Sequence, residues 1–159
     1  MGTSTVEVSH RYIPTDSDAG VGGDWFDVIP LSGGRVALTI GDVVGHGVGA
    51  AGLMGRMRIA VQTLAELDLT PGELLARVDV EASRLIEDDD LVALSASCLF
   101  LSYDPVSRQC TLVNAGQPPP LLRDADGSVR SLDLLTHPPL GMRQIMFETT
   151  TIKIGRAHV

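Results

Sequence analysis

The sequence has few basic residues, few cysteines and histidines, and no long apolar run. Lys and Arg together number 12 against 20 Asp and Glu, which gives a formal charge of −8 at pH 7. A chain with this charge repels a polyanion, so nucleic acid is not expected as a partner.

The two cysteines, Cys98 and Cys110, form no CxxC pair and lie in separate strand-like segments. We interpret them as reduced, buried thiols without a catalytic role. The four histidines are scattered and lack the spacing of a zinc site. A metal ion in this protein is therefore expected to be held by oxygen ligands.

No segment is apolar over the length needed to cross a bilayer, because serines interrupt the longest candidate, residues 91–103. The N-terminus also lacks the basic and then apolar pattern of a signal peptide. We therefore expect a cytoplasmic protein with no membrane insertion in this segment. The 159 residues, of which 44% are hydrophobic, fit one globular domain.

Runs of β-branched and aromatic residues predict strands on both sides of a helical region. SGG at Ser32 predicts a hairpin turn, which joins the second and third strands antiparallel because glycine accepts a positive φ. The expected strands cover residues 6–14, 24–31, 35–43, 94–104, 109–116, 119–124, 129–134 and 147–154.

Two helices are predicted between these groups of strands. Apolar residues recur at helical spacing from Leu53 to Leu64, which indicates a helix that begins near Gly49. Thr70 and Glu73, with a proline between them, have the order of an N-cap, first-turn proline and capping-box acid, and predict the start of a second helix. Strands, two helices and then strands again are typical of an α+β fold.

The stretch IGDVVGHGVGAAGL, from Ile40 to Leu53, contains the G-x-G-x-x-G spacing of a dinucleotide-binding turn. Asp42 would repel a pyrophosphate there, and a second helix follows where a nucleotide-binding fold needs a parallel strand. We therefore interpret the match as accidental and rank a nucleotide-binding module lowest. Gly45 and Gly47 instead allow a sharp turn from strand to helix.

Asp24 and Asp42 are candidate metal ligands, although each could also be a turn or cap aspartate. If the chain turns at Ser32, the two carboxylates come from roughly opposite positions at the same end of a sheet. Two acids in this position, beside glycines that admit close approach, suit Mg²⁺ or Mn²⁺.

Four separated motifs carry a family resemblance: GGDWFDVIPL, GRVALTIGDVVGHGVGAAGLMGRMRIAV, NAGQPPPLL and HPPLGM. In this order they resemble the bacterial metal-dependent serine/threonine phosphatases of the PPM type, in the branch of the stage II sporulation phosphatase and the stress-response regulators. The resemblance runs from about Arg11 to Ile154. It implies two antiparallel β-sheets sandwiched between α-helices, with two ions, Mn²⁺ or Mg²⁺, in a cleft at one end of the sheets.

The resemblance also implies how the metal would be held and used. It assigns metal ligation to the carboxylates of Asp24 and Asp42 and to the backbone carbonyl of Val43. A water that bridges two divalent ions loses its proton near neutral pH and can attack phosphorus in line, so no protein side chain is assigned as a catalytic nucleophile.

Three residues of the GHG motif, Gly45, His46 and Gly47, are expected near the phosphate or the cleft, and for His46 we favour a structural role. Gln117 stands where this branch often has histidine. An acid–base role is therefore not carried over to this position.

The implied function is that of a protein serine/threonine phosphatase acting on a regulatory protein such as a phosphorylated anti-sigma-factor antagonist. A homodimer of the full-length protein is one expected assembly. The alternative is a catalytically inactive phosphatase-fold module that docks a phosphoprotein or an anti-sigma-type kinase. The alternative draws support from the region after Phe147, where two acidic ligands expected from the family are not found.

Residues 1–154 are expected to form one C-terminally truncated phosphatase domain, and residues 155–159 a non-native tail. The closing string IGRAHV is also what ATCGGAAGAGCACACGTC encodes, a common sequencing-adapter string. A domain truncated in this way is expected to bind metal weakly and to be nearly inactive.

Overall fold

A computed structural model describes residues 6–13, 22–45, 47–88, 95–144 and 146–155 of the chain. His46 and residues 156–159 of the expected tail lie outside these described residues. The secondary-structure elements in chain order are β1 (Asp24–Pro30), β2 (Val36–Val44), α1 (Gly47–Ala65), α2 (Pro71–Asp88), β3 (Ser95–Asp104), β4 (Gln109–Ala115), β5 (Leu121–Arg123), β6 (Val129–Ser131), β7 (Thr136–His137) and β8 (Thr150–Lys153).

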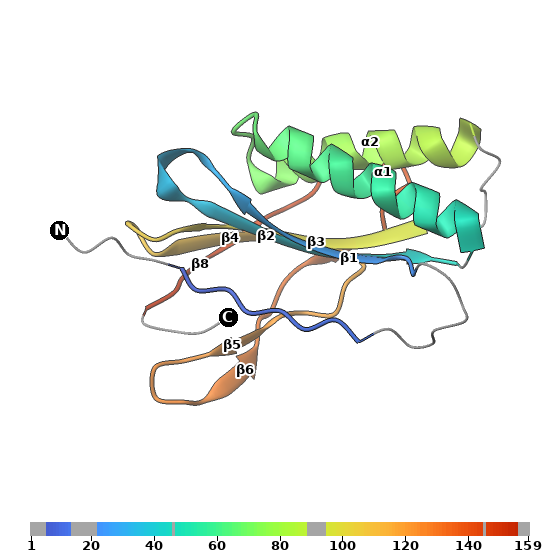
Figure 1. Ribbon diagram of the computed structural model, residues 1–159. Helices are drawn as coiled ribbons and strands as arrows, with labels where there is room; N and C mark the ends of the chain where they lie inside the picture. The colour runs from blue at the N-terminus through green and yellow to red at the C-terminus, as the bar shows by residue number, and fades with distance from the viewer. Residues whose placement is uncertain (1–5, 14–21, 46, 89–94, 145, 156–159) are drawn as a thin grey trace.

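The strands form a larger and a smaller sheet (Figure 1). The larger sheet has the order β1-β2-β3-β4-β7, and β8 pairs with β4 beside β7. Its pairings are antiparallel except for the short parallel contact of β7 with β4. The smaller sheet is the antiparallel pair β5-β6. The α+β class with two sheets, expected from the sequence, is confirmed, and both described helices lie on one face of the larger sheet.

The first hairpin turns where the sequence predicted. A short 3-10 turn, Ser32–Gly34, joins β1 to β2, and the positive φ angles of Gly33 and Gly34, 69° and 75°, are conformations that glycine adopts without strain. This turn fixes the register of the whole hairpin, from Pro30 opposite Val36 to the far end.

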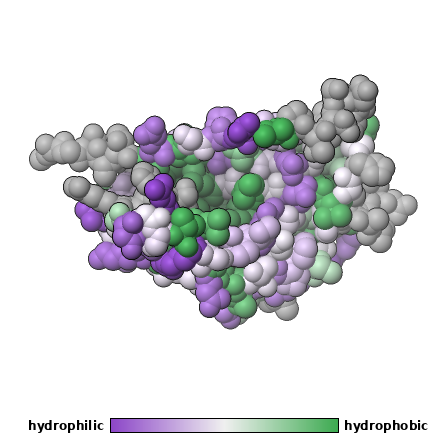
Figure 2. All heavy atoms as spheres, turned by 90° about the horizontal axis from the view of Figure 1, so that it is seen from below, coloured by the Kyte–Doolittle hydropathy of each residue, from purple (hydrophilic) through white to green (hydrophobic). Residues whose placement is uncertain are grey.

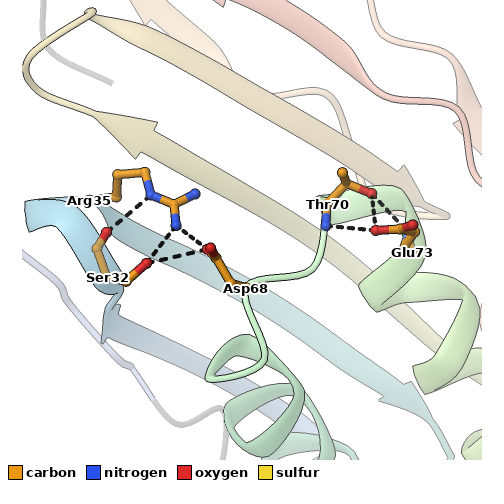
Figure 3. Close-up of polar contacts among 5 residues, drawn as sticks. All are labelled: Ser32, Arg35, Asp68, Thr70 and Glu73. Carbon is orange, nitrogen blue, oxygen red and sulfur yellow. Dashed lines mark hydrogen bonds and ion pairs between the residues drawn. The ribbon is translucent and has the colours of Figure 1, made fainter.

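Helix α2 begins with the predicted capping box (Figure 3). The Thr70 N–H and hydroxyl donate to the Glu73 carboxylate at 3.0 and 2.9 Å, and the Glu73 N–H donates back to the Thr70 hydroxyl at 3.3 Å. These bonds satisfy backbone donors that the first turn of a helix leaves open. The carboxylate gains two donors, so the pKa of Glu73 is lowered.

A second set of polar contacts in Figure 3 ties the hairpin turn to the loop between the helices. Arg35 donates to the carboxylate of Asp68 and also to the side-chain and backbone oxygens of Ser32. The pKa of Asp68 is lowered chiefly by its hydrogen bond and attraction to Arg35. One end of α1 is thereby held beside the first hairpin.

Two apolar cores lie on opposite faces of the larger sheet. The main core is between the sheet and the helices and contains Met57, Leu75 and Phe100, each at most 2% exposed. The second core, around Leu101 and Leu122, lies between the other face of the sheet and β5-β6. Cys98 and Cys110 are free and buried, and burial raises the pKa of each thiol to about 12, which disfavours the reactive thiolate.

Two local expectations were wrong. Residues 6–13, expected to be part of a strand, pair with no strand among the described residues. They instead run along the groove face of β1, where the ring centroids of His10 and Phe26 lie 4.6 Å apart. The two-residue strand β7 was missed because such a short run has no readable period. Among the described residues, no helix is long and apolar enough to cross a bilayer.

Candidate metal centre

Asp24 and Asp42 lie directly opposite each other in the first hairpin. Asp24 begins β1, Asp42 lies near the end of β2, and the two are Cα partners in the antiparallel register. Directly opposed residues point to the same side of a sheet with their Cβ atoms about 5 Å apart. The structure therefore confirms the predicted placement of the two carboxylates at one end of the sheet.

The electrostatics of Asp42 show that the two acids interact. Its pKa is raised, first by removal of the carboxylate from water, then by the negative charge of Asp24 and by a hydrogen bond between the two side chains. Two carboxylates in this arrangement repel each other when both are ionised. A divalent cation between them would remove this repulsion.

The backbone beside this pair is closely packed and depends on two glycines. The Val43 N–H donates to the carbonyl of Gly23 at 3.1 Å, and a Cβ placed on Gly23 would lie 2.5 Å from the Val43 carbonyl oxygen. A Cβ on Gly41 would lie 2.1 Å from the ring of Trp25. The Val43 carbonyl, predicted as a ligand, thus lies in a region where any side chain on Gly23 would contact it.

The loop that follows β4 reaches the same site. Asn114, fully buried at the end of β4, accepts from the Gln117 N–H at 2.9 Å and donates to the Gln117 carbonyl at 2.7 Å. The Gln117 side chain then donates to the Ser97 hydroxyl at 2.7 Å, and Ser97 donates to the backbone carbonyl of Asp42 at 3.3 Å. Two hydrogen bonds through the Ser97 hydroxyl therefore link the Gln117 side chain to the backbone of Asp42, the candidate metal ligand.

These residues border a groove of about 840 Å³ on the sheet face opposite the helices. Its lining includes Asp24, Asp42, Ser97 and Gln117, together with the segment 8–13. Figure 2 views this face, with hydrophobic residues in a hollow near the centre and hydrophilic residues around it. The candidate acids therefore open onto a surface large enough for part of another molecule.

Three other predicted site residues, Val43, Gly45 and Gly47, are not among the groove-lining residues. Gly45 and Gly47 follow β2 with φ angles of 131° and 84°, which confirms that they form the turn into α1, but they are not among the groove-lining residues. His46 is outside the described residues. The side chain of Val43 is buried on the helix-covered face, so only its backbone could act as a ligand.

The donor set fits one hard divalent ion better than two. Carboxylate and carbonyl oxygens with water are the ligands that Mg²⁺ prefers, and Mg²⁺ is often held by only one or two carboxylates. Within the described part of the chain, no three His, Cys, Asp or Glu side chains gather as a metal cluster. Asp24, Asp42 and the Val43 carbonyl would hold the ion.

Solved structures share this fold. The structure of the RsbU and RsbW domains of Rv1364c from Mycobacterium tuberculosis matches with a TM-score of 0.75 and 35% sequence identity, over 88% of this chain and 38% of that one. RsbX in complex with magnesium matches with a TM-score of 0.70 and 16% identity, over 91% of this chain and 66% of that one. Bacterial PP2C phosphatase domains are also among the structures of similar fold.

Sequence comparison defines the family. Residues 32–158 match the family model of stage II sporulation protein E (SpoIIE), and the chain belongs to this family of PPM-type phosphatase domains. The phosphoserine phosphatase RsbP of Bacillus subtilis (strain 168) is 26% identical over 131 residues, which cover 82% of this chain and 32% of RsbP. The chain thus spans about a third of the length of this curated relative.

The sequence did not reveal the contact of Ser97 with the Asp42 backbone. Ser97 is the Cα partner of Asp42 on β3, but 55 residues separate them along the chain. The pairing of β2 with β3 spans the helical hairpin inserted between them, and no local pattern in the sequence specifies it. The NAGQPP motif marked the loop of Gln117 without indicating what the glutamine contacts.

Proposed function

We propose that this chain is the catalytic part of a metal-dependent protein serine/threonine phosphatase. The observation that carries the proposal is the direct opposition of Asp24 and Asp42 at the mouth of a groove, in a chain of the SpoIIE family. The raised pKa of Asp42 indicates a site that gains from a cation. The magnesium in the structure of RsbX supports Mg²⁺, and Mn²⁺ has the same preference for oxygen ligands.

In this proposal Asp24, Asp42 and the Val43 carbonyl hold the cation against the end of the sheet. Bound divalent metal would lower the pKa of a water molecule and neutralise the oxygens of a phosphate group. Gln117 and Ser97 fix the backbone at Asp42, and Gly23 leaves the Val43 carbonyl uncovered. Two ions, as the family resemblance implies, remain part of the proposal for the complete protein.

The proposed substrate is a phosphoserine or phosphothreonine of a regulatory protein, such as an anti-sigma-factor antagonist. RsbP is named a phosphoserine phosphatase, and the Rv1364c structure joins an RsbU domain to an RsbW domain. These names support a place in signalling by phosphorylation of small regulators. A homodimer of the full-length protein is proposed on the family resemblance alone.

The alternative, an inactive module that docks a phosphoprotein or an anti-sigma-type kinase, is favoured by one observation. The part of the chain that the structure describes has no cluster of three acidic or histidine ligands. With only two carboxylates, metal affinity is expected to be weak, and binding without turnover would then be the function.

Phosphate release from phosphorylated antagonist proteins in Mn²⁺ and in Mg²⁺ separates these functions. The phosphatase proposal predicts release by the full-length protein that contains this chain, and about a hundredfold less by its Asp24→Asn and Asp42→Asn variants, because each substitution removes a charged ligand. Asp133→Asn, at an exposed aspartate outside the groove, is the control. A folded full-length protein that binds the phosphoproteins and releases no phosphate would support the docking alternative.

A further inference from the structure

A strip of exposed apolar side chains continues from the two carboxylates along the same face of the first hairpin. Side chains alternate between the faces of a sheet, so Phe26 and Val28 on β1 share the face of Asp24. Ile40 lies opposite Phe26 in the register and shares the face of Asp42. Phe26, Val28 and Ile40 are 37%, 43% and 50% exposed, and all three line the groove.

Arg11 lies beside the acidic end of this strip. The ring of His10 packs on Phe26, and the hydroxyl of Tyr12 lies 3.4 Å from where a Cβ of Gly22 would be. Arg11 lies between these two anchoring residues, just as Asp24 lies between Gly22 and Phe26. Arg11 is therefore flanked by contacts to Phe26 and to Gly22, the residues two positions on either side of Asp24, and it lines the groove.

The charge of Arg11 is exposed and has no ion-pair partner among the described residues. His10 and Arg11 are the basic residues that line the groove. The whole chain carries a charge of −8, so a phosphorylated partner approaches against a repulsive field. A guanidinium can offset this repulsion locally and bind a phosphate through two parallel N–H donors.

We propose that the groove takes an extended phosphoserine segment, that Arg11 contacts its phosphate, and that Phe26, Val28 and Ile40 contact apolar side chains next to the phosphoserine. This proposal rests on the proposed function for the reaction at the acidic end of the groove. It adds the class of partner that the groove selects: a phosphoserine with apolar neighbours in an extended chain. A free phosphate would contact only Arg11 and the cation at the acidic end, whereas a protein segment would also cover the apolar strip.

The test is steady-state hydrolysis by the full-length protein, in Mn²⁺, of a short peptide whose phosphoserine is flanked by leucine and valine. Arg11→Gln is expected to raise KM roughly tenfold, the usual loss for one charge-assisted hydrogen bond, with a smaller change in kcat. Arg11→Lys should recover part of the loss. Arg84→Gln is the matched control, because it removes the same charge from an exposed position on α2, which covers the opposite face of the sheet.

Two further comparisons test the apolar strip. Ile40→Ser should raise KM for the leucine-flanked peptide and leave KM unchanged for a glycine-flanked peptide and for para-nitrophenyl phosphate. Equal unfolding curves for all variants would exclude a loss of folding.

If Arg11→Gln and Arg84→Gln have the same KM as the parent, Arg11 is not the phosphate contact. If both flanking sequences give the same KM, the strip does not contact substrate.

Binding of the same peptides, followed by fluorescence polarisation, keeps this inference separate from the proposed function. A parent that binds the phosphopeptide without hydrolysing it, and loses binding in Arg11→Gln, would contradict the phosphatase proposal and support the groove. A parent that hydrolyses the peptide with no effect of Arg11→Gln would support the phosphatase proposal and contradict the groove proposal. A parent that neither binds nor hydrolyses the peptide would overturn both.

Discussion

The two faces of the larger sheet differ in how they are used. The face under α1 and α2 is closed by a packed apolar core, whereas the face of Asp24 and Asp42 keeps apolar side chains such as Ile40 half exposed along a groove. The second apolar core also lies on the groove face, mainly between β3, β4 and the pair β5-β6, so the difference is clearest in the first hairpin, where one side is packed and the other lines the groove. Leu38 of β2 is the exception, because it lines the groove and also packs against the second core.

The largest expected effect comes from the covered face. Met57→Ala should lower the free energy of unfolding by about 3 kcal/mol, because a fully buried side chain leaves a cavity in a packed core. Ile40→Ala on the open face should cost less than about 1 kcal/mol, because half of that side chain is already in water. Urea unfolding measures both, and similar losses would contradict the division between the faces.

An ion pair with one buried partner, Asp27, and one half-exposed partner, Arg58, joins the covered face to α1. Arg58 donates to both carboxylate oxygens of Asp27, at 2.7 to 3.1 Å, and Asp27 is only 9% exposed. The pKa of Arg58 is raised, chiefly by these hydrogen bonds. Asp27→Asn should cost about 2 kcal/mol, because it leaves the guanidinium with weaker acceptors.

A double-mutant cycle with Arg58→Met gives the coupling energy of this pair. The matched cycle on the exposed pair Arg84 and Glu81, which lie three residues apart on α2, should give only about 0.4 kcal/mol. Equal coupling in the two cycles would show that burial adds nothing to the Asp27 pair.

The open face should gain stability when its charge repulsion is removed. In EDTA, Asp42→Asn should stabilise the chain by roughly 0.5 kcal/mol, because like charges directly opposite in a sheet are destabilising. The folded pKa of Asp42 is raised above 3.8, so the folded state holds the proton more tightly. The parent should therefore lose stability relative to Asp42→Asn as the pH rises from 3.8 through the folded pKa. A relative gain over this range would contradict the account.

The smallest change in stability is expected at the start of α2, one of the two helices that cover the apolar core. The pKa of Glu73 is lowered by its hydrogen bonds with Thr70, so its contribution is present above its ordinary pKa of 4.5 and is lost as the pH falls through the folded pKa. Glu73→Gln should lower Tm slightly at pH 7 and leave it unchanged at low pH. Glu66→Gln, at an exposed glutamate of the loop between the helices, is the control. An equal shift of Tm in Glu66→Gln would show that Glu73 does not stabilise the helix by capping it.

Local patterns in the sequence were sufficient to predict the helices that cover one face of the sheet and the position of Asp24 opposite Asp42. The capping box predicted α2, and the SGG turn fixed a hairpin register that brings Asp24 opposite Asp42. These features depend on neighbours within one element or one turn. They can be predicted because the geometry of a hairpin or of a helix start is set by a few consecutive residues.

Features that depend on distant segments were not predicted. Asp79 lies on α2 among apolar residues, yet it is fully buried because its carboxylate accepts from the N–H groups of Gly141 and Gln144 at 2.7 Å each. Residues 6–13 have the composition of a strand but pack by side chains over β1. In both cases the partner comes from a segment that the local pattern does not specify.

The most direct test of the central claim is a calorimetric titration of Mn²⁺ into the parent chain, Asp24→Asn, Asp42→Asn and the control Asp133→Asn at neutral pH. The account predicts one saturable site in the parent and the control, and affinity reduced at least about tenfold in each of the two hairpin variants, because each loses a charged ligand. If both variants bind Mn²⁺ as the parent does, the opposed acids of the first hairpin are not the metal site.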